Sequence, residues 1–311
     1  MYDISIVLVN YRNKMLTEDC INSILNSNCK VSFEIIVVDN HSKDGSIEYL
    51  QEKFPNIIIS DSGRNLGFAF GNNIGVRMAI GKYVLLLNND TKIYKNMLDD
   101  LYETAEKNPK IGLLGCRAID CYGVELPITH SYENLSTIRL QSYIKPILEK
   151  MKLQRRLISI IKKKNTLNKE IIFTDWIAGS AMFINRKLYN DIGGLDENFF
   201  MYMEDEDFSH RINDAGYLVG VSNTIGYIHY CGGSTIQSYF LTKEYFKSRL
   251  LFFRRYNNNN FTSIKKALYA QIKVVNNNLS KNQLEKMKSE LDLYIEIELE
   301  KKAKYIKGIK E

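Results

Sequence analysis

The chain has 311 residues, 45% of them hydrophobic, which is sufficient for a sizeable buried core and excludes a globally disordered protein. Its net charge of +6 is unevenly distributed, because residues 145–169 and 243–311 each carry +8 and the remainder carries −10. An acidic core with basic attachments predicts a metal-using centre and a separate surface for an anionic partner.

The first 120 residues alternate between apolar strand patterns and helix patterns. Strands are predicted at 4–9, 34–38, 56–60 and 83–87, and helices at 17–26 (with Thr17 as N-cap), 44–54 and 71–80. Unbroken apolar strands separated by helices predict an α/β fold, with a Rossmann-like, mostly parallel sheet that has helices on both faces.

The second half of the chain has a less regular pattern. Residues 120–172 contain no clear strand, whereas a strand is predicted at 181–184, a helix over 204–216 with Gly216 after its end, and a strand with a glycine-rich turn over 226–235. From about 238 the pattern is helical and basic, and it is broken by the asparagines at 257–260. We therefore expect one domain at 1–237 and a basic helical extension at 238–311.

The cellular location is predicted from what the sequence lacks. The N-terminus has Asp3 where a signal peptide would have a basic region, and no apolar run approaches the ~18–20 residues of a spanning helix. The five cysteines form no CxxC pair and no zinc-binding spacing, so we expect them to be reduced and structural. These features predict a cytoplasmic protein.

Polar side chains follow three of the predicted strands at the point where each strand ends. These are Asn10-Tyr11-Arg12, Asp39-Asn40 and Asn88-Asn89-Asp90. Asn and Asp favour turns, so turn chemistry alone explains any single cluster. Because ligands bind beyond the carboxyl ends of strands in open α/β sheets, three such clusters favour a metal or phosphate site at this edge.

Four segments resemble, in order and spacing, the motifs of family 2 glycosyltransferases, and most closely those of the rhamnosyltransferase-like branch. They are "VVDNHSKDGS" (37–46), "RNLGFAFGNNIG" (64–75), "LLLNNDT" (85–91) and "FFMYMEDEDFSHR" (199–211). The resemblance covers roughly residues 3–235 and implies a GT-A fold, with a nucleotide-binding half at 1–118 and an acceptor-binding half at 119–237 that carries the basic insertion 145–169. The implied reaction is inverting transfer of a sugar from a nucleoside diphosphate.

The resemblance also implies which residues bind the donor. It assigns Asp39 to the nucleotide base and Arg64 and Asn65 to the base and ribose, with Asn10 and Asn89 completing the donor site. Gly67 would let the backbone approach the nucleotide closely. For Gly67 and Gly75, ordinary turn formation and helix packing remain alternative explanations.

A divalent metal, Mg²⁺ or Mn²⁺, is expected because the charge of the leaving diphosphate must be neutralised. The family pattern Asp-x-Asp is Asn88-Asn89-Asp90 in this chain, so Asp90 is the only anionic member. The resemblance assigns Asp90 and His229 as metal ligands. A hydrogen-bonded core histidine is the alternative for His229.

The run of four acids at 204–207 is predicted to hold the general base. The resemblance assigns Asp205 to that role, and we expect the neighbouring acids to raise its pKa. Favourable interaction with the helix dipole explains Glu206 without a catalytic role and is an alternative for Glu204. Asp207 is expected either to orient the loop or to pair with Arg211.

The segment "DWIAGSA" (175–181) resembles the family segment that lines the donor sugar and the acceptor. The resemblance therefore implies that both sugars lie against Trp176 and Gly179, with Glu204 close by. The indole ring of Trp176 suits the C–H face of a sugar, although a core aromatic residue is the alternative.

The leading hypothesis is an inverting, metal-dependent hexosyltransferase. Its donor would be a UDP- or dTDP-sugar, with dTDP-rhamnose among the candidates, and its acceptor a lipid-linked or growing surface polysaccharide. Residues 145–169 and 245–256 combine basic and apolar side chains, so we expect peripheral attachment to the inner face of the cytoplasmic membrane. Two solvated basic helices are the alternative. No oligomeric state is predicted.

Three alternatives have less support. A sugar-nucleotide nucleotidyltransferase would need a glycine-rich N-terminal loop, which "VNYRNKMLTEDC" lacks. A non-catalytic nucleotide-sugar-binding protein would not require Asp90, Asp205 and His229 together. A nucleic-acid partner is not expected, because no binding motif accompanies the basic segments.

Overall fold

The computed structural model describes residues 2–139, 170–230, 239–257, 260–275 and 280–308. The chain divides into two compact units: a sheet unit, residues 1–132 and 166–235, and a helical unit, residues 133–165 and 236–311. The separation of nucleotide-binding and acceptor-binding halves at residue 118 remains a prediction.

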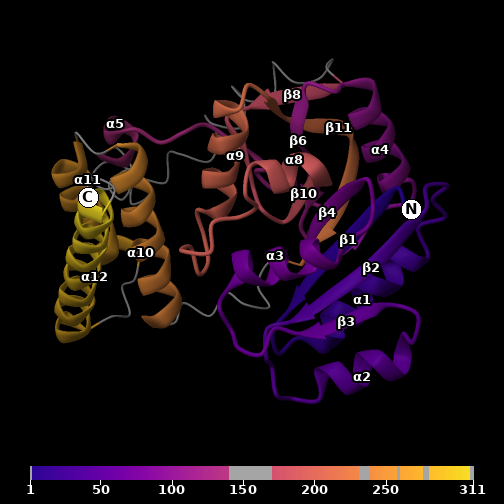
Figure 1. Cartoon of the computed structure of the whole chain (residues 1–311), viewed down its shortest axis with the longest axis horizontal. Coiled ribbons are helices and arrows are strands. Elements are labelled where there is room, and N and C mark those ends of the chain that lie inside the picture. The colour runs from indigo at the N-terminus through magenta and orange to yellow at the C-terminus, as the bar shows by residue number, and fades with distance from the viewer. Residues whose placement is uncertain (1, 140–169, 231–238, 258–259, 276–279, 309–311) are drawn as a thin grey trace. The chain divides into compact units, whose positions relative to one another are not determined.

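The sheet unit contains a mostly parallel sheet, which confirms the predicted α/β fold (Figure 1). Its strands, within the described residues, follow the order β3-β2-β1-β4-β10-β6-β11-β5, and β8 pairs with β11. Their bounds are β1 (Ile4–Asn10), β2 (Phe33–Asp39), β3 (Ile58–Asp61), β4 (Tyr83–Asn88), β5 (Thr91–Ile93), β6 (Ile111–Ile119), β8 (Ile171–Thr174), β10 (Ala181–Asn185) and β11 (Leu218–His229). β1 to β4 are parallel, whereas β10 and β5 run antiparallel to their neighbours.

The connections between the first four strands cover both faces of the sheet. α1 (Lys14–Leu25) and α2 (Ser46–Lys53) lead outward from β1 to β3, and α3 (Phe68–Met78) returns to β4 on the other side of β1. Because parallel connections are right-handed, this reversal puts α3 on the face opposite to α1 and α2. It also creates a topological switch point between β1 and β4, where open α/β sheets bind ligands.

Burial on both faces explains the continuous apolar runs of the central strands. Residues 35–38 of β2 and 84–87 of β4 are all buried. The helix above β1 packs closely, since a Cβ added to Gly75 would lie 2.3 Å from Val7 Cγ1. Of the two explanations for Gly75, the structure therefore supports helix packing.

Two expectations about element boundaries are wrong. α1 begins at Lys14 with Asn13 at its N-cap, so Thr17 lies inside the helix, where its hydroxyl donates to Asn10 Oδ1 at 2.9 Å. Residues 120–172 contain β7 (Thr129–His130) and the first two residues of β8. β7 pairs with β9 (Trp176–Ile177), a partner distant in sequence that local patterns do not reveal.

Three more helices complete the sheet unit in its described part: α4 (Met97–Lys107), α8 (Arg186–Asp191) and α9 (Glu204–Asp214). α9 confirms the helix predicted over 204–216. Gly216 follows its C-cap with φ of +84°, and its N–H donates to the Asn213 carbonyl at 2.9 Å.

The helical unit contains α5 (Leu135–Arg139), α10 (Tyr239–Tyr256), α11 (Phe261–Val275) and α12 (Lys281–Gly308). α10 and α11 are separated at the asparagines of 257–260, as predicted. Within this unit the guanidinium of Arg249 is 3% exposed, forms an ion pair with Glu133 and donates to Gln271 Oε1 at 2.7 Å.

The membrane-binding hypothesis now depends on fewer residues. Phe246, Leu250, Phe252 and Phe253 are buried, so these apolar side chains of 245–256 belong to the core of the helical unit rather than to a membrane-facing surface. The basic insertion 145–169 lies outside the described residues. Among the helices that are described, none is long and apolar enough to cross a membrane.

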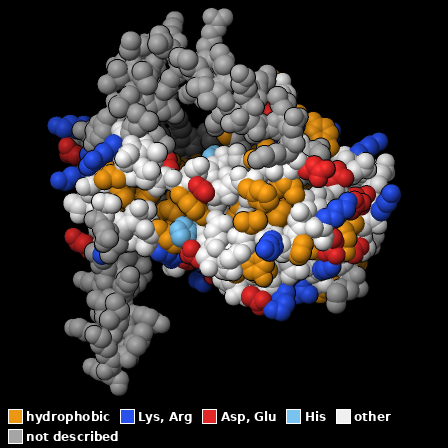
Figure 2. Space-filling model, turned by 90° about the horizontal axis from the view of Figure 1, so that it is seen from above, with side chains coloured by type: hydrophobic (Ala, Val, Ile, Leu, Met, Phe, Trp, Pro, Cys, Tyr) orange, Lys and Arg blue, Asp and Glu red, His pale blue; other side chains and the backbone are white. Residues whose placement is uncertain are grey.

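On the face seen in Figure 2, basic and acidic side chains lie side by side with apolar ones.

Candidate active site

A buried polar network joins the carboxyl ends of β1 and β2. Asn10 and Asp39 are the last residues of these strands and lie in register. Asn10 Nδ2 donates to Asp39 Oδ2 at 2.6 Å, and Ser42 donates to the two Asp39 oxygens from its N–H and its hydroxyl, each at 2.7 Å. Three donors therefore fix the orientation of a carboxylate that is only 1% exposed.

The network extends to Asn89, which follows β4. Asn89 Nδ2 donates to Thr17 Oγ1 at 2.8 Å and lies 3.4 Å from Asn10 Oδ1. The structure thus brings Asn10, Asp39 and Asn89 together at one edge of the sheet. These contacts give them a structural role in building the edge, and contact with a donor remains a prediction.

An open pocket of about 480 Å³ lies beside Asp39, within the size range of small-molecule sites. Lys43, Ile47 and Asp61 contribute to its lining. The adjoining His41 has φ of +59° and Lys43 has φ of +54°. Left-handed residues other than glycine cost free energy and cluster at functional loops, so this loop is a candidate for ligand contact.

Arg64, Asn65 and Gly67 lie between β3 and α3. Asn65 Oδ1 accepts from Gly67 N at 3.0 Å, which forms a turn before the helix. A Cβ added to Gly67 would lie 1.9 Å from the carbonyl oxygen of Phe200, and Phe68 N donates to that oxygen at 2.8 Å. The approach of Phe200 explains why glycine is required, and a nucleotide contact at Gly67 remains a prediction.

The two predicted metal ligands lie together although they are 139 positions apart in sequence. β11 pairs antiparallel with β5, which places His229 opposite Thr91 and therefore next to Asp90. Asp90 Oδ1 and His229 Nε2 are 3.1 Å apart, and the two side chains are 13% and 18% exposed. The alternative of a hydrogen-bonded histidine stays open, since Asp90 is itself such a partner.

The ligand types around Asp90 fit a divalent cation. A carboxylate oxygen and an imidazole nitrogen lie in direct contact, and the side-chain oxygen of Asn88, two residues before Asp90, is buried without a hydrogen-bond partner. In the described part of the chain, no cluster of three or more His, Cys, Asp or Glu side chains could hold a metal. A cation at this site would therefore need further ligands from a bound diphosphate.

Two backbone N–H groups hold the carboxylate of Asp205. Asp205 lies in the first turn of α9, and its Oδ2 accepts from Gly179 N at 2.8 Å while its Oδ1 accepts from Glu206 N at 2.9 Å. Burial raises the pKa of Asp205, and the two backbone N–H groups oppose this rise. Burial is thus the largest cause of the raised pKa of Asp205, and a contribution from the neighbouring acids remains a prediction.

Glu204 differs from Asp205 in its surroundings. It is 5% exposed and its Oε2 has no hydrogen-bond partner. Burial, followed by the charge of Asp205, raises the pKa of Glu204 well above its ordinary value. An unpaired buried carboxyl oxygen costs free energy unless a ligand satisfies it.

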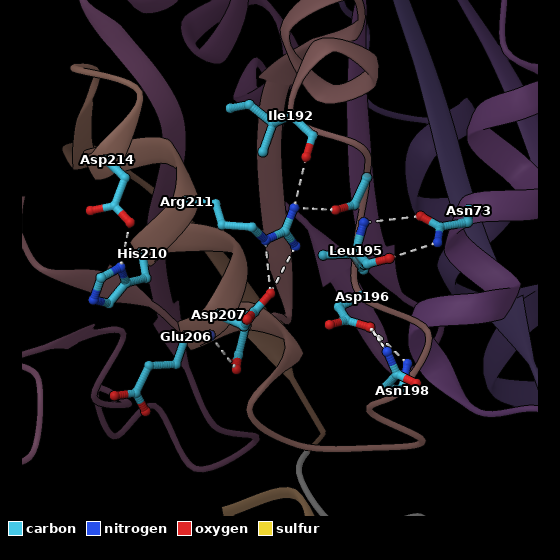
Figure 3. Close-up of polar contacts among 12 residues, drawn as sticks. Asn73, Ile192, Leu195, Asp196, Asn198, Glu206, Asp207, His210, Arg211 and Asp214 are labelled. Atoms are coloured by element: carbon cyan, nitrogen blue, oxygen red, sulfur yellow. Dashed lines mark hydrogen bonds and ion pairs between the residues drawn. The ribbon is translucent and has the colours of Figure 1, made fainter. Parts of the chain in front are cut away.

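Asp207 forms the expected pair with Arg211. Arg211 Nε donates to Asp207 Oδ2 at 2.9 Å, and its Nη1 donates to the carbonyls of Ile192 at 3.0 Å and Gly194 at 2.7 Å (Figure 3). The carboxylate of Asp207 is fully buried. Arg211 thus ties α9 to the segment before it, and the Asp207 carboxylate is engaged in the ion pair with Arg211.

Trp176 stacks on a residue that the sequence did not single out. The rings of Trp176 and His130 are 4.1 Å apart at 17°, because β7 and β9 pair directly. The indole Nε1 is buried without a hydrogen-bond partner. Sequence reasoning missed His130, since a strand of two residues has no recognisable pattern.

One backbone hydrogen bond connects the segment of the predicted metal ligands with the segment that binds the predicted base. Asn88 N donates to the carbonyl of Ser180 at 3.0 Å. Asn88 lies two residues before Asp90, and Ser180 directly follows Gly179, which binds Asp205. The Ser180 hydroxyl also bonds the hydroxyl of Tyr227, two residues before His229.

The fold and this polar edge define a glycosyltransferase with a GT-A architecture. The model of the family described as glycosyl transferase family 2 matches residues 5–189, so the chain belongs to that family. N-acetylglucosaminyl-diphospho-decaprenol L-rhamnosyltransferase of Mycobacterium tuberculosis is 25% identical over 65% of this chain and 67% of its own length. The low-salt glycan biosynthesis hexosyltransferase Agl10 of Haloferax volcanii is 29% identical over 73% of this chain and 67% of its own length.

Solved structures share the fold at lower identity. The mannosyltransferase PcManGT of Pyrobaculum calidifontis, in complex with GDP-Man and Mn²⁺, gives a TM-score of 0.55 at 12% identity, over 94% of this chain and 81% of that one. GalNAc-T7 with UDP, GalNAc and Mn²⁺ gives a TM-score of 0.55 at 15% identity. The match covers 80% of this chain and 47% of that one. At such identities the likeness establishes the fold alone.

Proposed function

We propose that this glycosyltransferase catalyses inverting transfer of a sugar from a nucleoside diphosphate to an acceptor hydroxyl, with Asp205 as general base and a divalent cation at Asp90 and His229. The hydrogen bond between Asn88 and Ser180 supports this most directly. It joins the strand end that leads to Asp90 to the loop that holds Asp205, so the two chemical roles would operate at one edge.

On the donor side, the nucleotide would extend from the Asp39 pocket across the ends of β1 and β4. Lys43 and Asp61 contribute to that pocket, and Arg64 and Asn65 would contact the base and ribose. The donor would be a UDP- or dTDP-sugar. The rhamnosyltransferase of Mycobacterium tuberculosis makes dTDP-rhamnose the first compound to test.

Asp90 and His229 would hold the cation, and the unpaired oxygen of Asn88 is a further candidate ligand. When bound, the cation would neutralise charge on the departing diphosphate as a Lewis acid. A mixed oxygen and imidazole set favours Mn²⁺ over Mg²⁺, which takes mainly oxygen ligands. Both solved relatives above were crystallised with Mn²⁺.

Asp205 would act on the acceptor. The acceptor oxygen forms a bond to the anomeric carbon, the bond from that carbon to the diphosphate oxygen breaks, and the hydroxyl proton passes to the Asp205 carboxylate. The N–H groups of Gly179 and Glu206 orient this carboxylate, while burial raises its pKa and makes it a better proton acceptor. Such a base typically contributes about 10²–10⁴-fold.

The acceptor would lie between Trp176 and Glu204. The face of the Trp176 ring opposite His130 would offer a flat apolar surface for a sugar, and the unpaired Glu204 oxygen would bond a neighbouring hydroxyl. A lipid-linked saccharide is the leading acceptor class, since the relative from Mycobacterium tuberculosis carries that substrate in its name. The basic insertion 145–169 would then bind the anionic cytoplasmic membrane surface that carries the acceptor.

The test is a panel of nucleotide sugars, comprising UDP-, dTDP- and GDP-linked hexoses. Donor turnover is measured with Mn²⁺, with Mg²⁺ and with chelator, using either water or an N-acetylglucosaminyl-diphospho-polyprenol as acceptor. We expect metal-dependent turnover of one nucleotide class and inversion at the anomeric carbon. Retention of configuration, or turnover unaffected by chelator, would overturn the proposed mechanism.

A further inference from the structure

Asn73 connects α3 to the segment that leads into α9. Its Oδ1 accepts from Leu195 N at 3.0 Å, and its Nδ2 donates to Leu195 O at 2.8 Å (Figure 3). The same Oδ1 accepts from the Tyr189 hydroxyl at 2.5 Å, and Nδ2 donates to Glu197 Oε1 at 2.9 Å. The amide pairs with both backbone groups of Leu195, as a neighbouring strand would. Asn73 is 8% exposed, so these bonds are largely protected from water.

The same segment approaches α3 closely at two further points, and a hydrogen bond fixes the second. Gly194 has φ of +70°, and a Cβ added there would lie 2.7 Å from Asn73 Oδ1. Five residues beyond Leu195, the Phe200 carbonyl accepts from Phe68 N at the start of α3. Residues 194–200 are therefore held along the helix that follows the predicted donor-binding segment.

The turn that follows is strained. Tyr202 and Met203 have φ of +68° and +69°, and they come directly before Glu204 and Asp205. Left-handed residues other than glycine cost about 1–3 kcal/mol each and persist only when the surroundings enforce them. On the C-terminal side of this turn, Arg211 anchors α9 through its bonds to the carbonyls of Ile192 and Gly194. The turn is thus held between two anchored flanks.

We propose that Asn73 is a positioning residue for Asp205. By fixing Leu195, it keeps the 195–203 segment in the strained conformation that aims the Asp205 carboxylate at the acceptor. The proposal rests on the role of Asp205 as base. It also implies that the donor-side helix and the base move together, because α3 carries one of the two anchors.

A purely structural Asn73 makes a different prediction. If the role were only structural, substitution of Asn73 would lower the stability of the fold and the fraction of active enzyme. Each molecule that folds would keep its rate constant. Asn73→Asp is close in shape and replaces the Nδ2 donor by an oxygen that faces Leu195 O and the Glu197 carboxylate. Asn72→Asp is the matched control, since Asn72 is buried on the same helix and its Nδ2 donates to Phe68 O within that helix.

Single-turnover kinetics with the donor selected by the panel separate rate from active fraction. We expect Asn73→Asp to lower the rate constant by about 10²-fold, the loss typical of a misplaced catalytic group, with donor affinity within about twofold of wild type. Asn72→Asp should keep the rate constant. A reduced amplitude with an unchanged rate constant for Asn73→Asp would overturn the proposal. If Asn73→Asp does not fold, Tyr189→Phe removes one bond to Asn73 Oδ1, and an unchanged rate constant there would also overturn it.

A double-mutant cycle with Asp205→Asn identifies the residue through which Asn73 acts. In the Asp205→Asn background, Asn73→Asp should cause no further loss, because the group that it positions is gone. Multiplicative losses would contradict the proposal even though Asp205 is the base. If Asp205→Asn alone keeps wild-type turnover, the proposed function fails first, and this inference fails with it.

Discussion

The carbonyl oxygen of Phe200 occupies the space in which a side chain at Gly67 would begin, since a Cβ there would lie only 1.9 Å away. Gly67 precedes α3, and Phe200 precedes the turn into α9. The contact therefore brings the predicted donor segment against the segment that carries the predicted base.

We expect Gly67→Ala to destabilise the protein strongly, because it adds this clash to the cost of a left-handed φ of +94°. Gly63→Ala is the control, since Gly63 has φ of +75° and open space around its Cβ position. The free energy of unfolding should fall by about 1–2 kcal/mol for Gly63→Ala and by at least about 3 kcal/mol for Gly67→Ala. Equal losses in denaturant titrations would show that the Phe200 contact is unimportant.

The second prediction concerns the cation. Asp90→Ala should abolish the Mn²⁺-dependent part of donor binding, and His229→Ala should weaken it less, because the carboxylate and the diphosphate remain. Asp214→Ala is a matched control, since Asp214 and His210 form an exposed pair with the same 3.1 Å separation. Calorimetry with and without Mn²⁺ provides the measurement. Unchanged donor affinity for Asp90→Ala in Mn²⁺ would remove Asp90 from the metal site.

The third prediction concerns the pH dependence of stability. The pKa of Glu204 is raised above its ordinary value of 4.5, so between these two values the folded state holds a proton that the unfolded state has released. Stability contributed by Glu204 is then fully present below pH 4.5 and is lost as the pH rises through the folded-state pKa. Glu204→Gln should therefore raise the Tm more at pH 7 than at pH 4. The exposed Glu103→Gln serves as control, and a gain independent of pH would contradict the assignment.

The fold was predictable because the decisive strands are buried on both faces. β1, β2 and β4 appear in the sequence as unbroken apolar runs, and α9 was predicted from its acidic first turn and Gly216. β11 was recognised only near its end, because Gly220, Ser222 and Asn223 interrupt its pattern and a bulge interrupts its register with β6. Its length depends on partners that the local sequence does not contain.

The site was predictable to a similar extent. Parallel strands end at one edge, so the meeting of Asn10, Asp39 and Asn89 follows from the strand pattern. The pairing of Asp90 with His229 was expected only from the family resemblance, since it depends on the contact of β5 with β11. The contact between Asn73 and Leu195 had no local signal, because an asparagine within a helix carries no mark of a partner 122 residues away.

The fourth prediction concerns membrane attachment through 145–169. The full-length protein should float with anionic phosphatidylglycerol vesicles at low salt and release at high salt, since each basic residue near such a surface contributes about 1 kcal/mol. Replacement by Gln of five basic residues in the insertion should abolish flotation: Arg155, Arg156, Lys162, Lys163 and Lys164. Replacement by Gln of five basic residues in the C-terminal tail is the control: Lys301, Lys302, Lys304, Lys307 and Lys310. Equal loss in both variants would indicate only a general charge effect.

The central claim is that Asp205 accepts the proton of the acceptor hydroxyl. Asp205→Asn keeps the shape of the side chain and removes its basicity, and Glu206→Gln is the adjacent control, because the Glu206 N–H that binds Asp205 remains. The decisive measurement is sugar transfer by the two variants under conditions where donor binding is measured in parallel. We predict that Asp205→Asn binds donor with near wild-type affinity and transfers sugar at least about 10²-fold more slowly, while Glu206→Gln stays close to wild type. Near wild-type transfer by Asp205→Asn would contradict the account.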